Sequence, residues 1–241
     1  MLREPLTPDT PFSPERIAAL LFDLDGTLLD SDDQAVEALA RRLALVCPRS
    51  SRRLARRLVM ALEGPGNDLF TLLDVLGLDQ PLTRLARRLS RWRGLRTVGN
   101  FRLVAGADEA LHRLAGRYRL AVVTTRGRRE AEAFLEQFAL RPLFEAVVTR
   151  ETTRRVKPHP APILHATQAL GLPPDHCVMV GDTVVDVRSA RRAGAWAVAV
   201  LCGFGEREEL ERAGAHWVLS SPADLPALLL REDVRNLALK A

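Results

Sequence analysis

Short apolar runs alternate with amphipathic stretches along most of the chain. Residues 17–29 begin with the first apolar run, which stops at acidic residues and glycine. Further apolar runs lie at 120–125, 146–149, 177–181, 195–200 and 216–219. Stretches with helical periodicity separate or follow them, at 107–116, 128–139, 161–170, 185–193, 206–213 and 223–230. Because strands and helices that alternate in this way form right-handed βαβ units, the pattern predicts an α/β fold. We expect a doubly wound, Rossmann-like parallel sheet with helices on both faces.

Residues 31–105 depart from this alternation, because helical periodicity runs through them without a strand. The expected helices lie at about 32–45, 52–62, 68–76 and 82–95, with proline and glycine between them. A helical insert directly after the first strand of an α/β sheet is typical of a lid. We therefore divide the chain into a proline-rich N-terminal extension (1–15), a core made of 16–30 and 106–241, and an inserted α-helical cap domain (31–105).

The composition is that of a folded chain, with 47% hydrophobic and 27% charged residues among 241. This apolar content excludes disorder, and no apolar run reaches the roughly 18–20 residues of a membrane-spanning helix. The extension has prolines in place of the basic and apolar regions of a secretory signal. Cys47, Cys177 and Cys202 are too widely spaced for a disulfide framework or a metal knuckle. We expect a cytoplasmic protein with no membrane partner.

The net charge of +5 is concentrated in the predicted cap, which contains 14 arginines and 7 acidic residues. Two of its expected helices carry arginines beside an apolar stripe, at 52–57 and 84–91. A solvated face is the default interpretation of this pattern. An electrostatic funnel for an anionic substrate and adventitious nucleic-acid binding, which a pI near 9.8 permits, are the alternatives. No recognition motif or aromatic platform supports specific nucleic-acid binding.

Four of the apolar runs end in, or lead into, residues suited to phosphate chemistry. Each motif alone is also common as a turn, a strand end, a solvated lysine or a helix cap. Because ligands bind beyond the carboxyl ends of the strands in an open parallel sheet, the four together predict one site. In chain order they are Asp23-Leu24-Asp25-Gly26-Thr27, Thr124-Thr125, Lys157-Pro158 and Gly181-Asp182-Thr183-Val184-Val185-Asp186.

This set of motifs closely resembles the haloacid dehalogenase superfamily, and within it the phosphoglycolate phosphatase-like members with a small helical (C1-type) cap. The resemblance extends from about residue 17 to 230 and includes the segment Gly203-Phe204-Gly205. It implies a Mg²⁺-dependent phosphatase that hydrolyses a small phosphate monoester through an aspartyl-phosphate. A sugar-phosphate mutase, a pyrophosphatase or a nucleotide phosphatase would use the same core. An inert scaffold or nucleic-acid-binding protein that uses the arginine-rich cap is a more remote alternative.

The resemblance also implies a role for each motif residue. Asp23 would be the nucleophile, and Asp25 the general acid and then the general base. Thr124 would donate its hydroxyl to the phosphoryl group, and Lys157 would stabilise negative charge there. Lys157 is one of only 2 lysines among 35 cations. Because a compact ammonium and a planar guanidinium are not interchangeable in a crowded pocket, a lysine at this position favours a special role for it.

Several carboxylates around a phosphate dianion require a divalent cation, and oxygen ligands suit Mg²⁺. Asp186 would act through water or orient Lys157. The implied metal set is Asp23, Asp25 through its backbone carbonyl, Asp182 and Asp186. The implied substrate-binding set is Leu24, Gly26, Thr124, Thr125 and Lys157.

One departure from the family pattern follows Thr124, where Thr125 stands in place of the frequent asparagine and is followed by Arg126. Arg126 could face either the site or solvent, and solvent is the default expectation, because most arginines are exposed. The five histidines are scattered and give no zinc-binding pair. The expected partner is a small phosphorylated metabolite, bound by a monomer or a homodimer.

Overall fold

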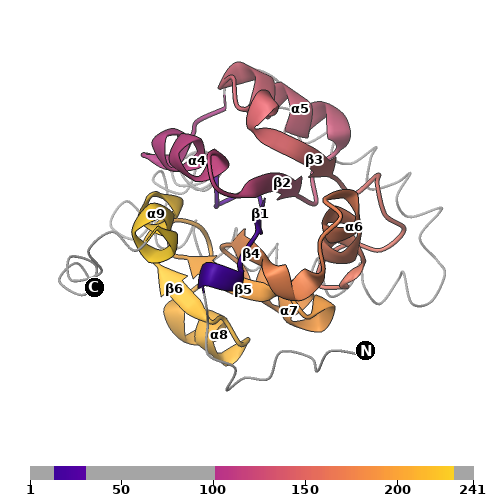
Figure 1. The fold of residues 1–241 in the computed structure, drawn as a ribbon, viewed down its shortest axis with the longest axis vertical. Helices are drawn as coiled ribbons and strands as arrows, with labels where there is room; N and C mark the ends of the chain where they lie inside the picture. The colour runs from indigo at the N-terminus through magenta and orange to yellow at the C-terminus, as the bar shows by residue number, and fades with distance from the viewer. Residues whose placement is uncertain (1–13, 31–100, 231–241) are drawn as a thin grey trace, which may run out of the picture. The chain divides into compact units, whose positions relative to one another are not determined.

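The computed structural model describes residues 14–30 and 101–230, whose centre is one parallel sheet (Figure 1). In space the strands follow the order β3-β2-β1-β4-β5-β6. The chain therefore moves outward from β1 to β3, returns to the other side of β1, and moves outward again to β6. This doubly wound order confirms the predicted fold class. The strands are β1 (Ala19–Phe22), β2 (Arg119–Val123), β3 (Phe144–Val148), β4 (Cys177–Gly181), β5 (Trp196–Val200) and β6 (Trp217–Leu219).

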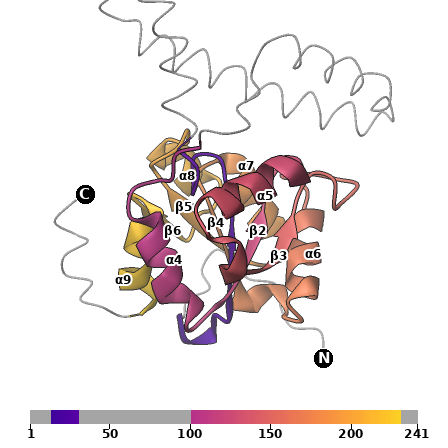
Figure 2. The same ribbon diagram turned by 90° about the horizontal axis from the view of Figure 1, so that it is seen from above.

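Helices cover both faces of the sheet. The α-helices are α4 (Ala107–Ala115), α5 (Arg128–Gln137), α6 (Ala161–Ala169), α7 (Val184–Ala193), α8 (Arg207–Arg212) and α9 (Leu225–Leu229). Short 3₁₀ turns are η1 (Pro14–Arg16), η2 (Arg141–Leu143), η3 (Pro174–His176) and η4 (Pro222–Asp224). The buried clusters and the two perpendicular views place α4, α5 and α9 on one face and α6, α7 and α8 on the other (Figure 1 and Figure 2).

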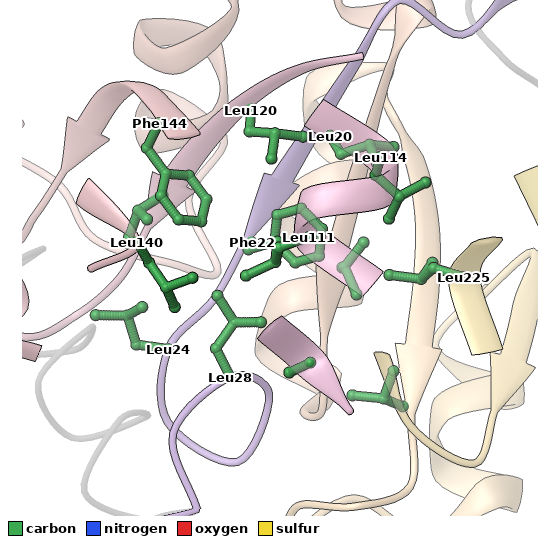
Figure 3. Close-up of a cluster of buried hydrophobic side chains, with 14 of the residues drawn as sticks. Leu20, Phe22, Leu24, Leu28, Leu111, Leu114, Leu120, Leu140, Phe144 and Leu225 are labelled. Atoms are coloured by element: carbon green, nitrogen blue, oxygen red, sulfur yellow. The ribbon is translucent and has the colours of Figure 1, made fainter. Parts of the chain in front are cut away.

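The two faces of the sheet bury side chains of different size. In β1, Leu20 and Phe22 point into one cluster, while Ala19 and Leu21 point into the other, as the two-residue repeat of a strand requires. The first cluster, in which leucine and phenylalanine surround Phe22 beside α4, is drawn in Figure 3. Full burial of such a side chain contributes roughly 1.5–3 kcal/mol. The burial of Leu20 and Phe22 in this first cluster, the large-residue cluster, therefore anchors β1. The first motif begins directly after β1.

The chain leaves the core after β1 and re-enters it beside the same point. Asp30 N donates to Arg102 O and Val104 N donates to Leu28 O, both at 2.9 Å. Phe101 and Val104 are buried in the large-residue cluster. The two ends of the intervening segment are therefore fixed next to each other.

Several interpretations of the sequence lie outside the described residues. They concern the extension up to residue 13, the cap between residues 31 and 100, and both arginine-rich helices, so these stay predictions. Within the parts that the structure describes, no helix is both long and apolar enough to cross a membrane.

Candidate active site

The strand order brings the four motifs together. Because β1 lies between β2 and β4, the residues that follow these three strands meet at one edge of the sheet, where the strand order reverses. Asp23 follows β1, Thr124 follows β2 and Asp182 follows β4. Lys157 enters from the loop between β3 and α6, and Asp186 from the first turn of α7.

Lys157 links two of the carboxylates. Its side chain is 3% exposed, and Nζ lies 2.9 Å from Asp23 Oδ1 and 2.5 Å from Asp186 Oδ1. The ammonium also donates to Val123 O at 3.1 Å. Burial lowers the pKa of Lys157, but the charges of Asp186 and Asp23 outweigh burial and leave the pKa raised. Lys157 therefore stays charged throughout the physiological pH range.

Asp186 is held rigidly from its other side by the start of α7. Its Oδ2 accepts hydrogen bonds from Thr183 N at 3.2 Å and from Thr183 Oγ1 at 2.6 Å. These contacts form a capping box, in which the third helical residue returns to the N-cap residue. The helix terminus thus fixes the carboxylate that orients Lys157.

Asp23 is buried in surroundings that disfavour its negative charge. Burial raises the pKa of its carboxyl to about 7, because desolvation and the charges of Asp186 and Asp25 together outweigh the attraction of Lys157. Although Oδ1 lies near Lys157, it accepts no hydrogen bond of good geometry from the described residues. Such a carboxylate is suited to binding a further positive charge.

Asp182 is enclosed by two backbone loops. Thr27 Oγ1 donates to its Oδ1 at 3.3 Å, and Phe204 N donates to its Oδ2 at 2.9 Å. A Cβ at Gly26 would lie 2.3 Å from Asp182 Oδ2, and one at Gly203 would lie 2.1 Å from the same atom. Gly26 also has φ +68°, which favours glycine. Both loops can therefore approach Asp182 this closely only because they lack side chains there.

The contact from Phe204 was not predicted as part of the site. The sequence suggested it only as part of the resemblance, in Gly203-Phe204-Gly205. A usable signal was the pair of glycines directly after an apolar run, since closely spaced glycines indicate a close backbone approach.

The carboxylates form a set that fits a hard divalent cation. One oxygen each from Asp23, Asp182 and Asp186 lies within 4.8 Å of the others, and all three residues are buried. Oxygen donors of this kind are the preferred ligands of Mg²⁺. The fit rests on the convergence of buried oxygens, on the unsatisfied Oδ1 of Asp23 and on the glycine-lined enclosure of Asp182.

The expectation that Arg126 faces solvent is wrong. Its Nε donates to Asp25 Oδ2 at 2.6 Å and its Nη2 donates to Asp25 Oδ1 at 2.5 Å. The two side chains are 25% and 30% exposed. An arginine can be this far buried because a carboxylate pairs with both arms of its fork. Burial lowers the pKa of Arg126, but the hydrogen bonds and charge of Asp25 leave it raised.

The remaining predicted residues differ in their accessibility. Thr124 is buried, and its Oγ1 accepts a hydrogen bond from Arg126 N at 3.1 Å. Thr125 is exposed. The Leu24 side chain is buried in the hydrophobic core. Any contact of Leu24 with a ligand would therefore be made by its backbone.

Comparison with known proteins agrees with this geometry. A family model described as haloacid dehalogenase-like hydrolase matches residues 20–200. The pyrophosphatase PpaX of Bacillus cereus (strain AH820) is 29% identical over 89% of this chain and 97% of its own length. A hydrolase from Pseudomonas syringae is 30% identical with a TM-score of 0.63, covering 89% of this chain and 98% of its own. A predicted phosphoglycolate phosphatase from Haemophilus somnus 129PT shares the fold, with a TM-score of 0.64 and 24% identity over 90% of this chain and 99% of its own.

Proposed function

The chain belongs to the haloacid dehalogenase-like hydrolases, and on this basis we propose that it is a Mg²⁺-dependent phosphatase. It would release phosphate from a small phosphate monoester through a phosphoaspartate at Asp23. The observation that carries the proposal is the convergence of three buried carboxylates, of which Asp23 and Asp186 also contact Lys157. A purely structural role would not require so many charges to be buried together.

The first half of the reaction would transfer the phosphoryl group to Asp23. A carboxylate oxygen of Asp23 attacks phosphorus and forms an O–P bond, while the bond from phosphorus to the leaving oxygen breaks. Asp25 gives a proton to that leaving oxygen, which departs as an alcohol. Asp25 lies two residues after Asp23 in the same loop and is partly exposed, so it can meet a leaving group that enters from solvent.

The second half would return the enzyme to its starting state. A water molecule attacks phosphorus and gives a proton to Asp25, which now acts as a base. The bond between phosphorus and Asp23 breaks, and phosphate leaves. Both aspartates regain the protonation states with which they began.

The neighbouring groups would stabilise the charge on the phosphoryl oxygens. Lys157 lies beside Asp23 and carries a fixed positive charge, and Thr124 keeps its hydroxyl proton available because its oxygen accepts the bond from Arg126 N. Asp23, Asp182 and the backbone carbonyl of Asp25 would hold Mg²⁺, with Asp186 acting through water or through Lys157. When bound, Mg²⁺ supplies the positive charge that lets an anionic substrate approach the carboxylates.

We further propose that the helical cap predicted for residues 31–105 is formed by the part of that segment that precedes Phe101, since Phe101 and Val104 are buried in the core. Its attachment directly after the first motif supports this, because the chain departs from the core at Asp30 and returns at Phe101. A cap there would restrict the substrate to small molecules and exclude bulk water.

Pyrophosphate is a second candidate substrate. The relatives named pyrophosphatase PpaX, such as the Bacillus cereus protein, are similar along nearly their whole length. Pyrophosphate would use the same residues, with phosphate in place of an alcohol as the leaving group. A panel of phosphorylated compounds that includes pyrophosphate separates the two candidates.

The test is phosphate release by the purified full chain with Mg²⁺, with EDTA and in Asp23→Asn. We expect EDTA and Asp23→Asn each to reduce release by at least about 10³-fold, since residues that act in one unit cannot replace each other. Asp108→Asn, at an exposed position in α4, is the matched control and should keep full activity. Wild-type protein quenched during turnover should carry a hydroxylamine-labile phosphate that Asp23→Asn lacks. Release that survives chelation or Asp23→Asn would contradict the proposal.

A further inference from the structure

Arg126 donates a hydrogen bond to each oxygen of the Asp25 carboxylate. The two contacts are short, at 2.6 and 2.5 Å, and come from different arms of the guanidinium. The backbone of Arg126 is fixed as well, since its N–H donates to Thr124 Oγ1. Arg126 is therefore tied by its backbone to the residue proposed to bind the phosphoryl group and by its guanidinium to the residue proposed to protonate the leaving group.

This position has a consequence for the substrate. A leaving group that reaches Asp25 must also come next to the guanidinium, because the two side chains are in direct contact. A guanidinium binds carboxylates and phosphates through two parallel hydrogen bonds, and in a partly buried setting it does so strongly. Neutral leaving groups offer it nothing comparable.

We propose that Arg126 is a specificity residue that binds a second anionic group on the leaving-group side of the substrate. The inference rests on the proposed function and defines its substrate class: phosphorylated compounds with a carboxylate or phosphate close to the scissile oxygen. A compound of the phosphoglycolate type and pyrophosphate both carry such a group. Their shared chemistry agrees with an arginine at this place.

The same contact explains how such a substrate would gain in turnover as well as in binding. While both Asp25 oxygens accept bonds from Arg126, neither is free to contact the leaving oxygen. The anionic group of the substrate takes over part of the guanidinium and releases an oxygen of Asp25, which then takes up from solvent the proton that it passes to the leaving oxygen. A substrate with a neutral leaving group leaves both hydrogen bonds between Arg126 and Asp25 in place.

A different role for Arg126 makes a different prediction. If the arginine only tethers Asp25 in place, its removal should lower turnover of every substrate by the same factor. If it binds the substrate, its removal should affect anionic leaving groups selectively. The ratio of two rates in one protein therefore separates the two roles, and a general loss of stability cancels from it.

The experiment compares phosphoglycolate with 2-hydroxyethyl phosphate, in which a neutral hydroxyl replaces the carboxylate. We expect Arg126→Gln to lower the ratio of the two kcat/KM values by about 10- to 100-fold, the range for loss of a charged, two-bond contact. Arg126→Lys, which keeps the charge without the fork, should lose less. Arg129→Gln is the matched control, because it removes the same charge from an exposed position three residues away and should leave the ratio unchanged.

A binding measurement excludes the chemical step. In Asp23→Asn, phosphoglycolate should bind more tightly than 2-hydroxyethyl phosphate, and Arg126→Gln in this background should remove the difference. An unchanged ratio in both measurements, or an equal loss for both substrates, overturns the role of Arg126 and leaves the hydrolase intact. A wild-type protein that releases no phosphate from any compound overturns the proposed function, and the role of Arg126 with it.

Discussion

The two ends of the sheet both carry charged side chains but place them in opposite surroundings. At the carboxyl ends, Lys157 and Asp186 form an ion pair whose side chains are 3% and 2% exposed. At the amino ends, Arg119 and Glu145 pair across β2 and β3 with 44% and 46% of their side chains exposed. Both pairs belong to the same sheet, and the difference is that the buried pair is formed by residues that follow the strands, while the exposed pair is formed by residues at their start.

The different exposure of the two ion pairs to water explains why the carboxyl ends of the strands are the better place for a catalytic site. Exposed pairs are screened and contribute little, whereas buried charges interact strongly and shift each other's pKa values. At the carboxyl ends, loops around Gly26 and Gly203 close over Asp182 and exclude solvent. At the amino ends the paired side chains remain in contact with water. Burial of the charge on Asp182 therefore depends on how closely the backbone can approach it.

The largest effect should follow from removal of the central cation. Lys157→Met would leave Asp23 and Asp186 facing each other without the ammonium between them. We expect phosphate release to fall by at least about 10²–10³-fold and the free energy of unfolding to fall by about 3–5 kcal/mol, the cost of breaking a buried pair. Steady-state kinetics and urea unfolding measure the two effects.

The opposite end of the sheet supplies the control for this variant. Glu145→Gln breaks the exposed pair with Arg119 and should change neither turnover nor the urea midpoint measurably. Lys157→Arg keeps the charge but should still be severely impaired, because the guanidinium is larger and planar. Near-normal kinetics in Lys157→Arg would refute the argument from charge geometry, and a large effect of Glu145→Gln would remove the contrast between the two ends.

An intermediate effect should follow when the approach of the backbone to Asp182 is blocked. A methyl group at Gly203 would lie 2.1 Å from Asp182 Oδ2, so Gly203→Ala must displace that carboxylate. We expect Mg²⁺ affinity to fall by about 10–100-fold, as it does when supporting contacts of a metal ligand are disturbed. Isothermal titration with Mg²⁺ measures this directly. Gly116→Ala, where a Cβ meets nothing within 4 Å and the backbone is helical, should bind Mg²⁺ normally.

The smallest effect concerns His216, at the amino ends of the strands. Burial lowers its pKa to about 4, with help from the charge of Arg191, and Nδ1 of the ring accepts a hydrogen bond from Ala197 N. Since a histidine in the unfolded chain binds its proton near pH 6.5, the unfolded state holds more protons between about pH 6.5 and 4. The contribution of His216 to stability is therefore present above pH 6.5 and is lost as the pH falls towards 4.

His216→Asn isolates this contribution, because the amide oxygen can still accept the bond from Ala197 N but does not titrate. We expect the stability difference between parent and variant to stay constant above pH 7 and to shift in favour of the variant as the pH falls from 6.5 to 4. Urea midpoints at several pH values provide the measurement. A difference that does not vary with pH would show that the imidazole titrates equally in both states.

The sequence predicted the scaffold of the site better than its contacts. Hydrophobic periodicity is a local signal, and it located the strand ends at Asp23, Thr124 and Asp182. The pairing of Asp25 with Arg126 depends instead on the neighbourhood of β1 and β2 in the sheet, which periodicity does not encode. Arg126 is also one of 33 arginines, so nothing in composition distinguished it, whereas the rarity of lysine did distinguish Lys157.

The hydrogen bond between Asp30 N and Arg102 O has a consequence for how such enzymes diversify. Because the core fixes both ends of the intervening segment side by side, the chain between them closes a loop whose entropic cost rises only slowly with length. The core can therefore exchange that segment for a longer, shorter or unrelated one while its own packing stays intact. Selection for a new substrate can act on the exchanged segment, while the residues of the core are inherited unaltered.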